Sequence, residues 1–160
     1  MALAWSDAKL GVVATIERST LLAFMQQELY AVQASVNDDG APQAAIVGVL
    51  VSEQFEVFFD TLANSRKTSN LRRRPRAAMV LGPAATGSAR TVQVEGLADE
   101  PTGDDLARLL QLYFARFPDG RERQRLPGIT YWRIRPTWIR FSDFSKDPPQ
   151  IVEVSPSDFA

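Results

Sequence analysis

The residues best suited to chemistry lie in a short basic segment in the middle of the chain. Positions 65 to 76 read SRKTSNLRRRPR, with six cations and no acidic residue. Arg66 and Lys67 stand at the start of a predicted short helix, beside the hydroxyl groups of Thr61 and Ser65. A guanidinium binds two anionic oxygens at once, an ammonium adds a compact charge, and a helix N-terminus offers unpaired N–H groups. This combination predicts a phosphate-binding site.

Two other interpretations of the segment stay open. The four arginines from position 72 onward fall late in the predicted helix or beyond it. Cations offset the helix dipole there, so solvated surface is their ordinary role, and the whole segment could be no more than a basic helix end. A role in nucleic-acid binding is weaker, because backbone binding needs an extended basic face and no aromatic residue interleaves with the arginines.

The absence of two residue types restricts the chemistry further. The 160 residues include neither histidine nor cysteine. This excludes a Ser-His-Asp triad, an imidazole base, a thiolate nucleophile and cysteine-ligated metal sites. Any reaction must use a carboxylate, a lysine, a tyrosine or a bound cofactor. We expect no metal site, because the acidic pairs at 38–39 and 104–105 are turn and helix-start residues.

Net charge and hydropathy predict the location of the protein and the partners that it does not bind. The formal net charge is −1, so the molecule as a whole is not built to coat nucleic acid or an anionic membrane. The longest apolar stretch, Ala44 to Val51, is far shorter than the roughly 20 residues of a membrane helix. No basic leader followed by an apolar run opens the sequence, so we expect no signal peptide and a cytoplasmic protein.

Hydrophobic periodicity predicts the elements that position the basic segment. A helix beginning at Ser19 or Thr20 places four apolar residues on one face: Leu21, Leu22, Met25 and Leu29. In residues 30–36, Tyr30, Val32, Ala34 and Val36 alternate with Ala31, Gln33 and Ser35, which predicts a half-buried strand. Residues 42–51 are apolar on both faces and predict a central strand covered on both sides, in which Gly48 marks a bulge or a close backbone approach.

The remaining elements complete a mainly β (α+β) domain. Further strands are predicted over 55–59, 77–81, 91–98, 129–135 and 137–142, the last two hinged at Pro136. A short basic helix is expected over about 67–73, and a second main helix begins after Thr102, three residues before Asp105. Six or seven antiparallel strands with two main covering helices are typical of a small split β-barrel. We place this domain at 19–145, between an N-terminal arm (1–18) and a C-terminal tail (146–160).

The order of these elements and one motif together resemble the pyridoxamine-phosphate-oxidase-like FMN-binding split barrels. The motif is FFDTLANSRK at 58–67, followed by Asn70, Leu71 and Pro75. The segment RTVQVEG at 90–96 is similar to a second strand of that family, where an Arg-Gln-Val pattern is usual. The resemblance covers roughly residues 21–144.

The resemblance implies an FMN-dependent oxidoreductase that forms a homodimer, with flavin bound at the subunit interface. It implies that Arg66 and Lys67 bind the FMN phosphate and that Thr61 and Ser65 assist. The backbone from Ala45 to Gly48 would run along the isoalloxazine ring. The full implied cofactor-binding set is Ala45, Ile46, Val47, Gly48, Asp60, Thr61, Ser65, Arg66, Lys67, Thr91 and Gln93. No catalytic acid or base stands out.

The sequence departs from the oxidase pattern at several positions. Ala45 stands where an arginine is usual, Leu50 where a lysine is usual, and Thr91 where a glutamine is usual. The oxidase's C-terminal Arg-x-His substrate motif is impossible in a chain without histidine. We therefore expect flavin chemistry on an unassigned small-molecule substrate rather than oxidation of pyridoxamine phosphate. Two alternatives stay open: a reductase on the same fold that uses the deazaflavin coenzyme F420, and a non-catalytic barrel that binds a ligand or nucleic acid.

Overall fold

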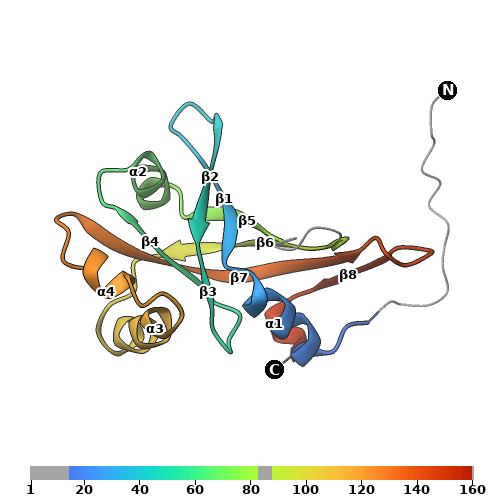
Figure 1. Ribbon diagram of the computed structural model, residues 1–160. Helices are drawn as coiled ribbons and strands as arrows, with labels where there is room; N and C mark the ends of the chain where they lie inside the picture. Colours follow the sequence, from blue (N-terminus) through green and yellow to red (C-terminus); the bar gives the residue numbers. More distant parts are fainter. Residues whose placement is uncertain (1–14, 83–87, 160) are drawn as a thin grey trace.

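The computed structural model describes residues 15–82 and 88–159 and shows a mainly β fold (Figure 1). Part of the predicted loop 82–89 lies outside these ranges. The described elements, in chain order, are α1 (Arg18–Gln27), β1 (Tyr30–Val36), β2 (Pro42–Gly48), β3 (Leu50–Val51), β4 (Val57–Leu62), α2 (Arg66–Arg73), β5 (Arg76–Leu81), β6 (Arg90–Asp99), α3 (Gly103–Arg116), α4 (Gly120–Arg123), β7 (Ile129–Asp143), β8 (Gln150–Val154) and a 3-10 helix, η1 (Pro156–Phe159).

The strands form one antiparallel sheet that curls into a half-barrel. The strand order is β2-β1-β5-β6-β7-β4-β3, and β8 pairs with β7 outside this path. The chain passes almost directly from β2 into β3, so the two ends of the path are neighbours in sequence. This architecture confirms the predicted split barrel.

Two apolar clusters hold the helices to the sheet. The larger one fills the inside of the barrel, where Leu21 and Met25 of α1 pack against residues such as Phe59 and Trp132. The smaller one lies under α3, where Leu109 and Tyr113 pack with Phe58 of β4. Because Phe58 and Phe59 are consecutive residues of one strand, their side chains enter opposite layers. β4 is therefore covered on both faces.

The predicted central strand over residues 42–51 is wrong. β2 lies at one end of the strand order, pairs only with β1, and leaves Ile46 72% exposed. Val49 interrupts the run, because its N–H donates to the carbonyl of Leu29 (2.9 Å). Leu50 and Val51 then pair with β4 as the separate strand β3.

The predicted division into two strands at Pro136 is also wrong, since β7 runs unbroken for 15 residues. An irregularity does lie at this place: Glu95 and Gly96 of β6 pair with Trp138 and Pro136, so Thr137 of β7 is the extra residue of a β-bulge. A Cβ atom on Gly96 would stand 2.3 Å from the carbonyl oxygen of Arg135. The bulge in β7 and the glycine in β6 together let the two strands stay paired past the proline, which cannot donate a ladder hydrogen bond.

Several element ends differ from the predictions. α1 begins at Arg18, so neither Ser19 nor Thr20 caps it, and Leu29 lies beyond the helix and is 44% exposed. The third strand begins at Val57, because Phe55 belongs to the preceding turn with a φ of 62°. The tail continues the fold: β8 pairs with β7, and η1 follows it.

The second main helix begins where the sequence predicts, but its start is stabilised differently. Thr102 is the N-cap of α3 but makes no side-chain capping hydrogen bond. Asp105, the expected capping-box partner, instead accepts a hydrogen bond from Arg133 of β7 (2.8 Å). This ion pair lowers the pKa of the Asp105 carboxyl group. The acid therefore fixes the helix to the sheet.

Candidate functional site

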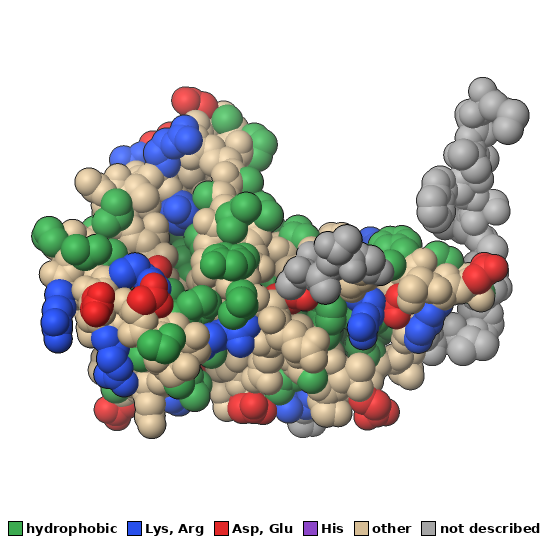
Figure 2. Space-filling view, in the orientation of Figure 1, with side chains coloured by type: hydrophobic (Ala, Val, Ile, Leu, Met, Phe, Trp, Pro, Cys, Tyr) green, Lys and Arg blue, Asp and Glu red, His purple; other side chains and the backbone are tan. Residues whose placement is uncertain are grey.

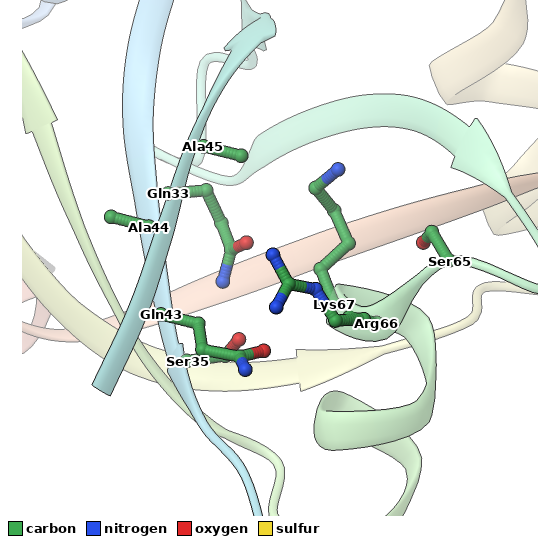
Figure 3. Close-up of a pocket in the computed structure, with 8 residues that line it drawn as sticks. All are labelled: Gln33, Ser35, Gln43, Ala44, Ala45, Ser65, Arg66 and Lys67. Atoms are coloured by element: carbon green, nitrogen blue, oxygen red, sulfur yellow. The ribbon is translucent and has the colours of Figure 1, made fainter. Parts of the chain in front are cut away.

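A cavity of about 230 Å³ opens between the start of α2 and the β1–β2 hairpin (Figure 3). Pockets that enclose whole small ligands have volumes of roughly 300–1,000 Å³. This cavity is therefore sized for one end of a ligand, such as a phosphate group. Its lining residues come from three elements and the turn before α2: Gln33, Ser35, Gln43, Ala44, Ala45, Ser65, Arg66 and Lys67.

The start of α2 supplies a positive electrostatic field. Ser65 is the N-cap, with extended backbone and a hydroxyl that accepts a hydrogen bond from the N–H of Thr68 (3.3 Å). No acidic residue stands in the first turn of the helix. The positive end of the helix dipole is therefore not neutralised within the helix, and it adds to the charges of Arg66 and Lys67.

Arg66 and Lys67 differ from the later cations of the same helix. Within residues 15–82 and 88–159, neither of the two forms an ion pair. Lys67 Nζ donates only a long hydrogen bond, 3.4 Å, to Thr61 Oγ1. By contrast, Arg72 forms a bidentate pair with Glu100 (2.7 and 2.9 Å), and Arg73 pairs with Asp38. The early cations are available to a ligand, while these two later ones fix the helix to its surroundings.

Polar side chains of the hairpin form the opposite wall of the cavity. Gln33 and Ser35 on β1 are 1% and 4% exposed, so they face the inside of the half-barrel. Asn70 of α2 donates hydrogen bonds of 3.0 Å to Ser35 Oγ and to Gln43 Oε1. This network fixes α2 against the hairpin at the edge of the cavity.

This wall was not among the predicted binding residues. Gln33, Ser35, Gln43 and Ala44 line the cavity, and Asn70 supports it, yet none was predicted to bind a ligand. A signal was present, because Gln33 and Ser35 are the polar members of an otherwise apolar alternation in β1. The structure shows that this polar side is the buried one.

Of the eleven predicted cofactor-binding residues, the cavity brings four together: Ala45, Ser65, Arg66 and Lys67. Thr61 lies beside them through its contacts with Lys67 Nζ and with Ser65 Oγ, each 3.4 Å.

Asp60 lies on the other face of β4 from Thr61. Its carboxylate accepts a hydrogen bond of 3.0 Å from Arg123 of α4. Arg123 also donates to the hydroxyl of Tyr113 (3.3 Å), whose pKa is raised by burial and by the charge of Asp60. Asp60 therefore attaches α4 to the sheet, and the structure does not bring it to the cavity.

The space beside Gly48 is filled by an aromatic ring at an ordinary contact distance. A Cβ atom on Gly48 would stand 3.5 Å from the ring of Phe117, which follows α3. Val47, the residue before it, is buried in the core. Contacts of Val47 and Gly48 with a ligand stay predictions.

Ile46, Thr91 and Gln93 lie away from the cavity. Ile46 stands directly across from Val32, Val32 from Val80, and Val80 from Gln93, so these residues form one row across β2, β1, β5 and β6. Thr91 is two residues before Gln93 on β6 and alternates with the buried Val92. All of them belong to the outer face of the sheet.

This outer face carries exposed apolar side chains. Tyr30, Val32, Ile46 and Val80 are 62%, 40%, 72% and 41% exposed, and we call these four residues the apolar patch. All four line one shallow depression on this face. Hydrophobic side chains gather over β1 and β2 in the space-filling view (Figure 2). Contiguous apolar surface of this kind marks an interaction site.

Comparison with protein families decides what the chain is related to. A profile described as pyridoxamine 5'-phosphate oxidase matches residues 18–143, from the start of α1 to the end of β7. The chain belongs to this family. No curated protein matches the chain.

Solved structures share the fold at low sequence identity. A heme binding protein from Mycobacterium smegmatis superposes with a TM-score of 0.76 and 15% identity, over 92% of this chain and 61% of that one. A putative pyridoxamine 5'-phosphate oxidase from Listeria innocua gives 0.61 and 21%, over 78% and 96%. A pyridoxamine 5'-phosphate oxidase-related, FMN binding protein from Nostoc punctiforme gives 0.58 and 12%, over 86% and 90%. The chain thus spans less than two thirds of the length of the Mycobacterium protein. Both an FMN binding protein and a heme binding protein have this fold.

Two further findings concern the part of the chain that the structure describes, residues 15–82 and 88–159. No helix there is long and apolar enough to cross a membrane. No group of three or more acidic side chains there is arranged to hold a metal ion.

Proposed function

We propose that this member of the pyridoxamine 5'-phosphate oxidase family is an FMN-binding oxidoreductase whose substrate is not assigned. The observation that carries the proposal is the pair of cations, Arg66 and Lys67, at a helix start where neither forms an ion pair within the described ranges. A phosphate monoester supplies the two negative charges and the acceptor oxygens that such a pair lacks. The FMN binding protein of the same fold supports a flavin as the bearer of that phosphate.

The cavity fits the phosphate end of FMN. Arg66 and Lys67 offer donors from one side, and Gln33 and Ser35 offer donors from the other. A volume of about 230 Å³ leaves the flavin ring outside the cavity. The ring must therefore lie along the neighbouring surface of the protein.

Strand β2 offers that surface. It is an edge strand, so one side of its backbone is not used by the sheet. Ala44 and Ala45 carry small side chains, which lets a flat ring approach the backbone, and free N–H groups there would hydrogen-bond to its polar edge. When bound, the flavin would supply the electron chemistry, and the chain's own residues would bind and orient it.

The composition favours a flavin over haem. The chain contains neither histidine nor cysteine, the residues that most often ligate haem iron. A flavin needs no such ligand, because it is held by its phosphate and by hydrogen bonds to its ring. The heme-binding proteins of the same fold are therefore a weaker guide to this chain than the FMN-binding one.

We further propose that the protein is a homodimer that uses the apolar patch as its interface. The patch shares β1 and β2 with the cavity, so a second copy seated on it would also approach the ring expected along β2. Thr91 and Gln93 lie on the same outer face, which agrees with a role for them at an interface. Two-fold pairing of one apolar surface with itself is the commonest way in which soluble chains associate. A cytoplasmic location stays a prediction from the sequence.

The visible absorption spectrum of the purified protein tests the cofactor. We expect flavin bands that persist after desalting, or that appear when the colourless protein is titrated with FMN. A protein that takes up no FMN contradicts the proposal. Competition by coenzyme F420 at equal concentration would instead identify a deazaflavin protein, and uptake of haem with a Soret band would identify a haem protein. Salt-sensitive binding of an oligonucleotide without flavin uptake would support a non-catalytic barrel.

A further inference from the structure

Gln33 is the most unusual polar residue of the cavity. It is 1% exposed, yet its Nε2 atom has no hydrogen-bond partner among the residues that the structure describes. Leaving a buried donor unpaired is destabilising, so native proteins rarely do it. The side chain lines the cavity and, in the close-up, its carboxamide extends toward the space in front of the Arg66 guanidinium (Figure 3).

The neighbours of Gln33 leave that space open. Gln33 stands directly across from Ala45, whose side chain ends at Cβ, so nothing longer from β2 covers the amide. On the same face of β1, Ser35 Oγ already accepts a hydrogen bond from Asn70, and so does Gln43 Oε1 on β2.

This arrangement fixes the polarity of the hairpin wall. Because Asn70 occupies those two acceptors, what Ser35 and Gln43 have left to offer the cavity is mainly hydrogen-bond donors. Gln33 Nε2 adds a third donor. A wall of neutral donors that faces two cations fits a ligand group made of acceptors only, and a phosphate group is such a group.

We propose that Gln33 is a ligand-binding residue, and that its Nε2 donates a hydrogen bond to an oxygen of the phosphate group held by Arg66 and Lys67. The identity of the whole ligand as FMN rests on the proposed function. The binding of a phosphate group by Gln33 rests only on the geometry of the cavity. It assigns the recognition of phosphate to two opposite walls of the cavity, one cationic and one neutral. The neutral wall adds affinity without adding net charge.

Two substitutions of Gln33 test the inference. Gln33→Met keeps the length of the side chain and removes the donor, while Gln33→Glu keeps its shape and replaces the donor by an anionic acceptor. Since a hydrogen bond to a charged group contributes about 1.5–3 kcal/mol, we expect the dissociation constant for FMN to rise about tenfold or more in Gln33→Met. A larger rise is expected in Gln33→Glu, because its carboxylate repels the phosphate. Fluorescence titration measures FMN, and isothermal calorimetry measures inorganic phosphate as a second probe.

The same two changes at Gln111, an exposed residue of α3, provide matched controls. These should bind both probes as the unsubstituted protein does. If Gln33→Glu does not fold, as judged by circular dichroism, Gln33→Met alone decides, since it introduces no charge.

The outcomes separate the inference from the proposed function. Binding of FMN that weakens in the Gln33 variants supports both, whereas FMN binding that stays within twofold in Gln33→Met overturns the role of Gln33 alone. If the unsubstituted protein binds inorganic phosphate but no FMN, and the Gln33 variants lose phosphate binding, the role of Gln33 stands. The proposal that the ligand is a flavin is then wrong. A protein that binds neither probe overturns both.

Discussion

Asn70 of α2 and Ser35 of β1 are joined by a hydrogen bond of 3.0 Å between two buried side chains. The two residues are 35 positions apart in the sequence, and the same Asn70 nitrogen also donates to Gln43. This contact fixes the helix that carries the cations to the hairpin that carries the neutral donors. The Asn70 amide therefore joins the two walls of the cavity directly, in addition to the ion pair between Arg73 and Asp38 at the tip of the hairpin.

Replacing this amide should loosen the site. In Asn70→Ala, Ser35 and Gln43 lose their common donor, and we expect the free energy of unfolding to fall by about 1–3 kcal/mol. FMN affinity should fall as well, because α2 is no longer held at the cavity edge. Urea unfolding and FMN titration measure the two effects. Asn64→Ala, in the turn before α2, is the control, and an Asn70→Ala protein of unchanged stability would contradict this account.

Removing both cations should abolish FMN binding. The double variant Arg66→Ala/Lys67→Ala removes the groups that neutralise the phosphate, and neither forms an ion pair within the described ranges. We therefore expect a folded protein that no longer retains flavin, with a dissociation constant raised about a hundredfold or more. Arg121→Ala/Arg125→Ala removes the same charge at and after α4 and should leave binding intact. Stoichiometric flavin in the first variant would refute the phosphate assignment.

A charge in the apolar patch should separate the proposed dimer. Ile46 is the most exposed member of the apolar patch, at 72%, so Ile46→Asp would bury an unpaired carboxylate in the interface. We expect the dimer dissociation constant to rise about tenfold or more, as measured by analytical ultracentrifugation. Leu112→Asp, at a 42% exposed position on α3, should leave the dimer unchanged. If the unsubstituted protein is a monomer at all concentrations, the interface proposal is wrong.

The ion pair between Arg72 of α2 and Glu100 should make the free energy of unfolding depend on pH. Hydrogen bonds from Arg72 and Thr130 hold the pKa of Glu100 below its usual value of 4.5. The unfolded chain regains the usual pKa, so the stabilisation is complete above about pH 5 and is lost as pH falls through the lowered value. In Glu100→Gln, the free energy of unfolding should decrease less steeply between about pH 5 and pH 3. Denaturant titrations at a series of pH values measure this slope, and an unchanged slope would contradict the prediction.

Gly96, which pairs with Pro136 beside the bulge in β7, should tolerate no side chain. A Cβ atom on Gly96 would stand 2.3 Å from the carbonyl oxygen of Arg135, so Gly96→Ala forces β6 away from β7. We expect a loss of about 1–3 kcal/mol in the free energy of unfolding. Gly48→Ala is the comparison, because its nearest neighbour would be at an ordinary 3.5 Å. Equal stability of the two variants would show that the bulge can relax.

The sequence and the structure agree best where a pattern is local. The predicted helix over 67–73 exists as α2, with Ser65 as its N-cap, because capping and charge act within one turn. The motif at 58–67 likewise identified the family, which the profile match confirms. The strands over 30–36 and 77–81 are present because alternation with a period of two shows in a single strand.

The predictions failed where the answer depended on partners distant in sequence. Apolar composition made residues 42–51 look like a covered strand, but burial is decided by what packs on a strand, and Ile46 is open in the single chain. Asp60 and Thr61 are neighbours in the motif, yet successive side chains of a strand point to opposite faces, so only Thr61 reaches the cavity side.

By itself, the sequence determined which residues carry charge at the start of α2, where most of the strands lie, and that any redox chemistry must come from a cofactor. Only the tertiary structure decided that the polar side of β1 faces inward and that Gln33 lies opposite Arg66. The reason is physical. Alternation of polar and apolar residues shows that a strand has two different faces. Which face is buried depends on the curl of the sheet and on the packing of α2 against it. Those contacts join residues that are far apart in the chain.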